Sequence, residues 1–325
     1  MNKESLLRYV GWRLALVLPT LLAASLLVFL ALRLLPGDVA LTALSGSGEV
    51  THNVQQVQRI RQELDLDQPL AVQYGRWLGS MATGGFGGRS LEQRQPIGSL
   101  LGRQLPVTLL VTLYTLLISV TVGIPLGALA AVYEGRWPDY LVRGISIAGQ
   151  SVPTFFLAIL LMLGLLIAFQ WSPPLVYAHP WSDPWTHLQM MAWPALALSW
   201  GYGSYLARMT RACLVEALRQ DYIRTADAKG LPRRVVVLRH GLRNALVPLI
   251  SLAGLQIGLL LGGAVVLEVI FGLPGIGRGM AQAASSRDYP VVQTYAVVLA
   301  FLVLVVNLLT DLVYAWADPR IGYQA

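Results

Sequence analysis

The chain has 325 residues, of which 55% are hydrophobic and 13% are charged, and its formal net charge is +7. This composition excludes an ordinary soluble domain and indicates a polytopic membrane protein. The basic residues are spread over loops between apolar runs, which argues against the clustered basic face of a nucleic-acid-binding protein. The single cysteine, Cys213, excludes an intrachain disulfide.

An uncharged run between Arg13 and Arg33 predicts the first transmembrane helix, because it has about the length that crosses the hydrocarbon core. The basic residues ahead of it, Lys3 and Arg8 among them, also suit a cleaved signal peptide. The apolar run is longer than that of a typical signal, however, and no small-residue cleavage site closes it. We therefore expect residues 1–33 to form a cytoplasmic N-terminus and a retained first span.

Residues 34–103 form the one sizeable hydrophilic region, and we expect them to be an extracytoplasmic subdomain between the first two spans. Helical periodicity predicts short helices at Val54–Leu64 and Ala71–Ala82, the second with Tyr74 and Trp77 on one side. Amphipathic helices of this kind beside a span often lie at the membrane interface. The region acts either as a solvated cap or as a surface that contacts a delivered substrate or its carrier.

Five further apolar runs predict five more spans within residues 104–316, so the fold class is all-α with six transmembrane helices. Gly123 and Gly127 in the second span are expected to admit a neighbouring backbone. The runs lie at residues 104–133, 144–169, 184–207, 244–267 and 289–310.

The loop charges predict the orientation of the chain in the membrane. Most Lys and Arg residues lie near the N-terminus, in the short turn at Arg136 and in residues 208–243, while seven of the others fall in or beside the long 34–103 region. Positive charge in short loops marks the cytoplasmic side. Both ends, including the tail at 317–325, and the loop 208–243 are therefore expected in the cytoplasm.

Motifs for catalysis, nucleotide binding or metal binding are not found in the sequence. There is no G-x-x-x-x-G-K-[ST], and neither of the two lysines, Lys3 and Lys229, follows a glycine. Two of the four histidines, His179 and His187, share a Trp-rich outer loop without a third ligand at suitable spacing. We expect no catalytic residue, cofactor or metal in this chain, so that any ATP-driven work depends on another polypeptide.

The polar residues inside the predicted spans are neutral, which argues against a proton or ion relay and permits a water-lined path. Hydrogen bonding between helices is the alternative role for each of them. Pro153 follows two polar residues, where it can open backbone groups toward a cavity. The candidates for lining the path are Gln150, Ser151, Thr154, Ser199, Gln256 and Asn307.

Within the basic loop 208–243, apolar residues recur at helical spacing. Val215, Leu218, Tyr222 and Ala226 fall three or four residues apart, so a helix there has one apolar stripe beside basic residues. A short amphipathic helix exposed to the cytoplasm is suited to docking in a groove of another protein.

Seven stretches spread over most of the chain have a recognisable wording: RLLPGD, LDQPLAVQYGRWL, QPIGSLLGRQLPVTLLVT, DYIRTADAKGLPRRVVVLRHGLRNALVP, EVIFGLPGIGRGM, RDYPVVQ and DLVYAWADPRIGY. They resemble the permease subunits of ATP-binding-cassette (ABC) importers, in the peptide/nickel/opine branch. The general signature of the coupling loop in these subunits contains Glu-Ala-Ala, and those positions read Arg224-Thr225-Ala226 here, as is usual in that branch.

The resemblance implies the type I ABC importer permease fold in a bacterial plasma membrane. This chain would form a heterodimer with a second permease subunit, two ABC ATPase subunits would bind ATP and Mg²⁺ beneath, and an extracytoplasmic solute-binding protein would deliver the substrate. Short peptides are the first expectation for the solute. The alternatives are a metal chelate, an opine or a glutathione-like solute, or, in a different class, a self-sufficient channel or carrier.

By the same resemblance, the chain carries a coupling helix that enters a cleft of one ATPase. Tyr222, Ile223 and Ala226 would be buried there, while Arg224 and Lys229 would pair with acidic residues at the rim. Gly230 would end the helix in the left-handed conformation. The residues implicated are Asp221, Tyr222, Ile223, Arg224, Thr225, Ala226, Lys229 and Gly230.

Overall fold

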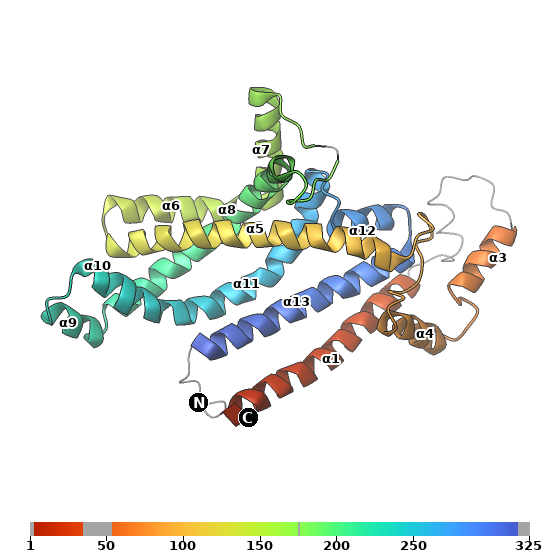
Figure 1. Ribbon diagram of the computed structural model, residues 1–325, viewed down its shortest axis with the longest axis horizontal. Coiled ribbons are helices and arrows are strands. Elements are labelled where there is room, and N and C mark those ends of the chain that lie inside the picture. The colour runs from red at the N-terminus through yellow and green to blue at the C-terminus, as the bar shows by residue number, and fades with distance from the viewer. Residues whose placement is uncertain (1–2, 35–53, 175, 318–325) are drawn as a thin grey trace. The chain divides into compact units, whose positions relative to one another are not determined.

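The computed structural model describes residues 3–34, 54–174 and 176–317. Helices dominate these residues, and the described part contains no β-strand, only an isolated bridge between Arg89 and Pro96 (Figure 1). The helices are α1 (Lys3–Arg33), α3 (Val54–Glu63), α4 (Leu70–Ala82), α5 (Ile97–Val132), α6 (Trp137–Ser151), α7 (Thr154–Phe169), α8 (Pro184–Leu218), α9 (Asp221–Ala228), α10 (Arg233–Val235), the π-helix η1 (Val236–Leu242), α11 (Arg243–Ile270), α12 (Ile276–Ser285) and α13 (Tyr289–Ala317).

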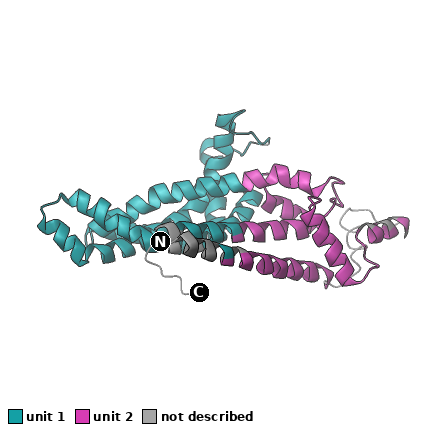
Figure 2. Ribbon diagram, turned by 60° about the horizontal axis from the view of Figure 1, so that its bottom comes forward, with its two compact units in different colours: residues 1–11, 109–273, 305–325 teal, residues 12–108, 274–304 magenta. Residues whose placement is uncertain are grey.

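The chain divides into two compact units, which Figure 2 shows in different colours. Unit 1 contains residues 1–11, 109–273 and 305–325, and unit 2 contains residues 12–108 and 274–304. The RLLPGD stretch after Leu34 and the tail 318–325 lie outside the described residues.

Four helices of the described chain are long and apolar enough to cross a membrane. They confirm the helical character of the first, second, fifth and sixth predicted runs, although composition alone does not reproduce the full count of six spans. Their apolar portions are Ala15–Arg33, Ile97–Val132, Leu252–Ile270 and Tyr289–Val313.

The predicted third span is not one helix. It is divided into α6 and α7, which are bent by 99° at a short break. Val152 caps α6 in an extended conformation, and Pro153 precedes α7. Because the residue before a proline disfavours the α region, the sequence Val152-Pro153 ends one helix and starts the next at a new angle.

The predicted fourth span lies in α8, which has 35 residues and is therefore long enough to cross. It is not apolar enough to count among the four, because Trp, His, Gln, Gly and Ser residues lower its hydropathy. Instead, α8 packs against α6, α7 and α11 within unit 1. Helix α8 therefore forms the centre of unit 1, where side chains such as Met191, Leu206 and Leu214 are fully buried.

Small residues allow helices of unit 1 to approach α8 closely. A Cβ atom on Gly123 of α5 would lie 2.6 Å from the carbonyl oxygen of Gly203, and one on Gly127 would clash with the carbonyl oxygen of Ala207. The expectation that Gly123 and Gly127 admit a neighbouring backbone is confirmed. On α6, a Cβ on Gly149 would collide with Ser204 in the same way.

Unit 2 has its own core, in which the start of α5 packs against α12 and α13. Ile97, Ile276 and Tyr295 are completely buried there. Helix α5 begins at Ile97, so the predicted boundary at residue 103 falls inside a helix. Residues on both sides of that boundary contribute to the same core, which also includes the region after residue 274.

The predicted helices of the hydrophilic region are present as α3 and α4, within a residue or so of the expected limits. The aromatic face of α4 packs against Phe29 of α1, with ring centroids 5.4 Å from Tyr74 and 6.3 Å from Trp77. The hydroxyls of Tyr74 and Ser25 share a hydrogen bond of 2.8 Å. This aromatic face therefore attaches α4 to the first apolar helix.

Candidate functional site

Along the chain, the helix α9 is a separate element that follows the long helix α8 and precedes α10, η1 and α11 (Figure 1). It has 8 residues, Asp221 to Ala228, close to the predicted limits of Asp221 and Lys229. Ile223 is 1% and Ala226 is 5% exposed, whereas the other residues of the helix are exposed. One side of α9 is therefore fixed to the rest of the chain and the opposite side is accessible.

The buried side of α9 packs inside unit 1. Ile223 and Ala226 form an apolar cluster with Val236 of η1 and Leu218 of α8. Two of the three residues assigned to a partner's cleft by the sequence resemblance are thus covered by this chain itself. Tyr222, the third, remains 40% exposed.

The C-terminal end of α9 has the hydrogen bonds of a Schellman motif. The amide of Gly230 donates to the carbonyl of Asp227 at 2.9 Å, and that of Leu231 donates to the carbonyl of Ala226 at 3.4 Å. Gly230 has φ = 72°, a left-handed conformation that other residues adopt at a cost. The left-handed conformation predicted for Gly230 is confirmed.

The exposed side of α9 carries Asp221, Arg224 and Thr225, with Lys229 just beyond the helix end. The side chains of Arg224 and Asp221 are 80% and 95% exposed, and they are 3.4 Å apart. An exposed pair of this kind contributes little to stability, so both groups are free to contact another protein.

A π-helix leads from the α9 region into α11, and no sequence pattern signalled it. This segment, η1, has 7 residues, and its Gly241 lies against α8. A Cβ on Gly241 would be 3.0 Å from both Leu214 and Leu218. Because η1 contacts α8, α9 and α11, these elements form a packed junction. A displacement of α9 therefore displaces its packed neighbours as well.

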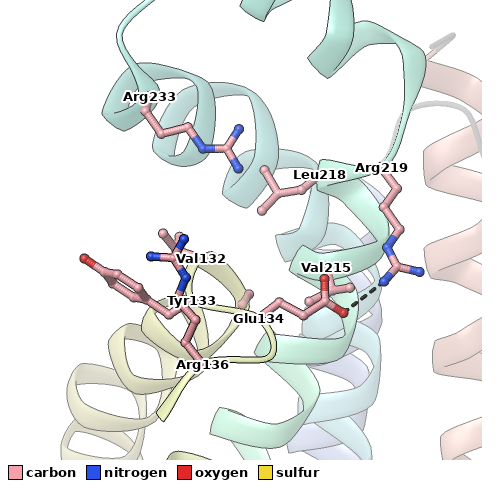
Figure 3. A pocket seen from close by; sticks show the side chains of 9 residues that line it. Val132, Tyr133, Glu134, Arg136, Val215, Leu218, Arg219 and Arg233 are labelled. Carbon is pink, nitrogen blue, oxygen red and sulfur yellow. Dashed lines mark hydrogen bonds and ion pairs between the residues drawn. The ribbon is translucent and has the colours of Figure 1, made fainter. Parts of the chain in front are cut away.

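A cavity of about 520 Å³ opens beside this junction, between the end of α5, the end of α8 and α10 (Figure 3). Three arginines line it, Arg136, Arg219 and Arg233. Glu134 is the one carboxylate in its lining, and it accepts a hydrogen bond of 2.9 Å from Arg219 (Figure 3). Among the charged groups of this lining, the basic ones therefore outnumber the acidic one.

A second cavity, of about 450 Å³, lies among α6, α7, α8 and α11. Its lining includes Gln150, Thr154 and Gln256, which come from three different helices. The break at Val152 and Pro153 forms part of the same lining. The structure therefore brings together three of the six residues that the sequence suggested for a path.

The other three path candidates do not line this cavity. Ser151 and Ser199 donate hydrogen bonds to carbonyls of their own helices, at Ile147 and Leu196. Asn307 lies on α13 and is exposed. Hydrogen bonds within their own helices therefore satisfy the hydroxyl groups of the two serines.

Two features of unit 1 were missed by the sequence reasoning. Asp139 at the start of α6 accepts two hydrogen bonds from Arg211 of α8, at 2.5 and 2.7 Å, and its side chain is 1% exposed. This bidentate pair links α6 to α8. Arg208, one turn earlier on α8, lines the second cavity.

Comparison with known proteins identifies the family. Residues 123–323 match the family described as "Binding-protein-dependent transport system inner membrane component", and residues 6–112 match the corresponding N-terminal family. A protein of Brucella suis biovar 1, named as a peptide transport system permease, is 40% identical over 312 residues, covering 96% of this chain and 98% of the relative.

Two further relatives support the same assignment. The glutathione transport system permease protein GsiC of Salmonella paratyphi A is 38% identical over 319 residues, covering 98% of this chain and all of the relative. A solved structure of the MetNI methionine ABC transporter, inward facing, matches with a TM-score of 0.55 and 22% identity, over 69% of this chain and 98% of that one. At that identity the structural match shows the fold, which is that of an ABC importer permease. The chain therefore belongs to the family of inner-membrane components of binding-protein-dependent transport systems, the permease subunits of ABC importers.

Proposed function

We propose that this chain is one of two permease subunits of an ATP-driven importer that carries short peptides across the bacterial plasma membrane. Its membership of the permease family and its relatives named for peptide transport support this role. A solute-binding protein delivers the substrate from outside, and both termini of the chain lie in the cytoplasm. ATP and Mg²⁺ are bound by two partner ATPase subunits and by no residue of this chain.

The observation that carries the proposal is the helix α9, held on one side and free on the other. Ile223 and Ala226 attach the helix to η1 and α8, so they transmit force rather than enter the partner. The accessible side of α9, with Tyr222, Arg224 and Thr225, is then the surface that docks in a cleft of one ATPase. Arg224 and Lys229 pair there with acidic residues of the ATPase.

Movement of α9 reaches the membrane helices through its packed junction. When the ATPases close on nucleotide, they carry α9 as a rigid body. Helix α8 enters this region from one side and η1 continues into α11 on the other. These are two of the helices that line the cavity of about 450 Å³, which we assign to this subunit's half of the translocation path.

A second candidate function is import of a glutathione-like solute by the same machine. It is favoured by the 38% identity with GsiC, which covers nearly the whole chain. Metal chelates and opines are further solutes of this branch, and a self-sufficient channel is the alternative from another class.

Reconstitution in proteoliposomes tests the proposal. The complete complex contains the second permease, the ATPases and the binding protein. It is expected to transport di- or tripeptides only when ATP is present on the side of the membrane where the ATPase subunits lie. Uptake of glutathione but of no other peptide would favour the second candidate. Solute flux through the purified chain alone, without ATPase subunits, would contradict both.

A further inference from the structure

Helix α8 carries three arginines in its second half or just beyond its end, and one of them has no partner among the residues that the structure describes. Arg211 is hydrogen bonded to Asp139, and Arg219 to Glu134. Arg208 has neither an ion pair nor a hydrogen bond with any residue in the described part of the chain. Its side chain is exposed and contributes to the lining of the 450 Å³ cavity.

The rest of the cavity lining contains no carboxylate to neutralise Arg208. Its polar members are the neutral side chains of Gln150, Thr154 and Gln256, together with two tyrosines. The hydroxyls of Tyr202 and Tyr205 donate to the carbonyls of Ala253 and Leu252, at 3.0 and 3.3 Å. These hydrogen bonds tie the tyrosines to α11. Because every other residue of the lining is neutral, Arg208 carries the only formal charge in it.

The two tyrosines also pack against each other in the cavity lining. Their rings are stacked at 14°, with centroids 6.5 Å apart. A volume of about 450 Å³ falls within the range of small-molecule sites. The cavity therefore combines the size of a small solute, neutral hydrogen-bonding groups and one uncompensated guanidinium.

A guanidinium without a counter-ion in such a cavity favours an anion, and its planar fork matches a carboxylate through two parallel hydrogen bonds. The positive-inside rule explains basic residues at this end of α8, but it does not require one of them to face a cavity. Arg243, at the start of α11, adds the same charge to the loop and lies outside this cavity's lining.

We infer that Arg208 binds a carboxylate of the transported solute as it passes through this subunit, with Gln150 and Gln256 contacting its neutral amide groups. The inference rests on the proposed function and adds a substrate class: solutes that carry a free carboxylate, such as the C-terminus of a short peptide. Arg208 is then a specificity-determining residue inside the membrane subunit.

The test compares a substrate with its C-terminal amide in the reconstituted complex. Among dialanine, trialanine and glutathione, the solute that the unaltered complex takes up fastest is paired with its amide. For glutathione, whose γ-glutamyl residue carries a second free carboxylate, both carboxylates are amidated. The variants are Arg208→Gln, Arg208→Lys and the matched control Arg243→Gln. The same binding protein serves every variant, so its own preference cancels when the carboxylate-to-amide uptake ratios are compared between variants.

Arg208→Gln is expected to lower that uptake ratio by about tenfold, because a hydrogen-bonded charge contact of ordinary strength is lost. Arg208→Lys is expected to lie between, and Arg243→Gln to leave the ratio unchanged. An unchanged ratio in Arg208→Gln overturns the inference while leaving the proposed function intact, even if the uptake of carboxylate and amide falls equally. If the unaltered complex takes up none of the three solutes, the proposed function fails and the inference fails with it.

Discussion

Replacing Gly230 tests whether the defined end of α9 is needed for coupling. With φ = 72°, a residue other than glycine at this position costs about 1–2 kcal/mol, and a β-branched residue costs more. A Cβ atom at Gly230 meets no atom within 4 Å, so the cost is conformational and not steric. Each 1.4 kcal/mol is about a tenfold change in the population of the ordered end.

The assay is ATP hydrolysis by the complete reconstituted complex, stimulated by the loaded binding protein. We expect stimulation to fall in the order Gly230→Asn, Gly230→Ala, Gly230→Val, because asparagine tolerates the left-handed region best. Gly135 provides a matched control, since it has φ = 74° and equally open surroundings but lies in the turn before α6. Full stimulation in Gly230→Val, or an equal loss in Gly135→Val, would refute the reasoning.

Three further predictions concern unit 1 and the orientation of the chain. Asp139→Asn removes the buried negative charge beside Arg211 but keeps one acceptor oxygen, so it should destabilise the purified subunit by about 1.5–3 kcal/mol in thermal unfolding; an unchanged midpoint would contradict this. Ile223→Ala should cost about 2–5 kcal/mol locally and increase proteolysis around α9 while leaving its exposed side chains in place; unaltered proteolysis would count against the packing described. In a Cys213→Ala background, Lys229→Cys should react with an impermeant maleimide only from the cytoplasmic side, and labelling of intact cells would reverse the assigned orientation.

The apolar runs predicted the membrane helices well where hydrophobicity alone determines them. The runs at 104–133, 244–267 and 289–310 lie almost wholly inside α5, α11 and α13. The run at 144–169 is not one continuous helix, because the conformational effect of Val152-Pro153 is local and is not visible in a hydropathy window. The run that predicted the fourth span lies in α8, whose polar and small residues lower its hydropathy because part of its surface packs against α6, α7 and α11.

The site was predictable where it depends on neighbours in sequence. The family resemblance and the position of Gly230 were enough to place α9 and its end. Helical spacing alone was not, because the stripe expected from Val215 to Ala226 is divided between α8, which ends at Leu218, and α9, which begins at Asp221. The resemblance assigned Ile223 and Ala226 to a partner, although they pack on Val236 and Leu218 of this chain, because a sequence shows the apolar residues of a helix but not what covers them. Contacts between distant residues, such as Asp139 with Arg211, left no local signal.

Cross-linking between α9 and an ATPase subunit tests the central claim most directly. In a Cys213→Ala background, Thr225→Cys places a thiol on the accessible side of α9, and single cysteines are introduced along the rim of the ATPase cleft. We predict a permease–ATPase cross-link in the assembled complex whose yield changes when nucleotide is added. Gly135→Cys in the same background is the comparison. A complex that is active and intact, yet forms no cross-link from position 225 and instead forms them from position 135, would contradict the claim that α9 receives the motion of the ATPases.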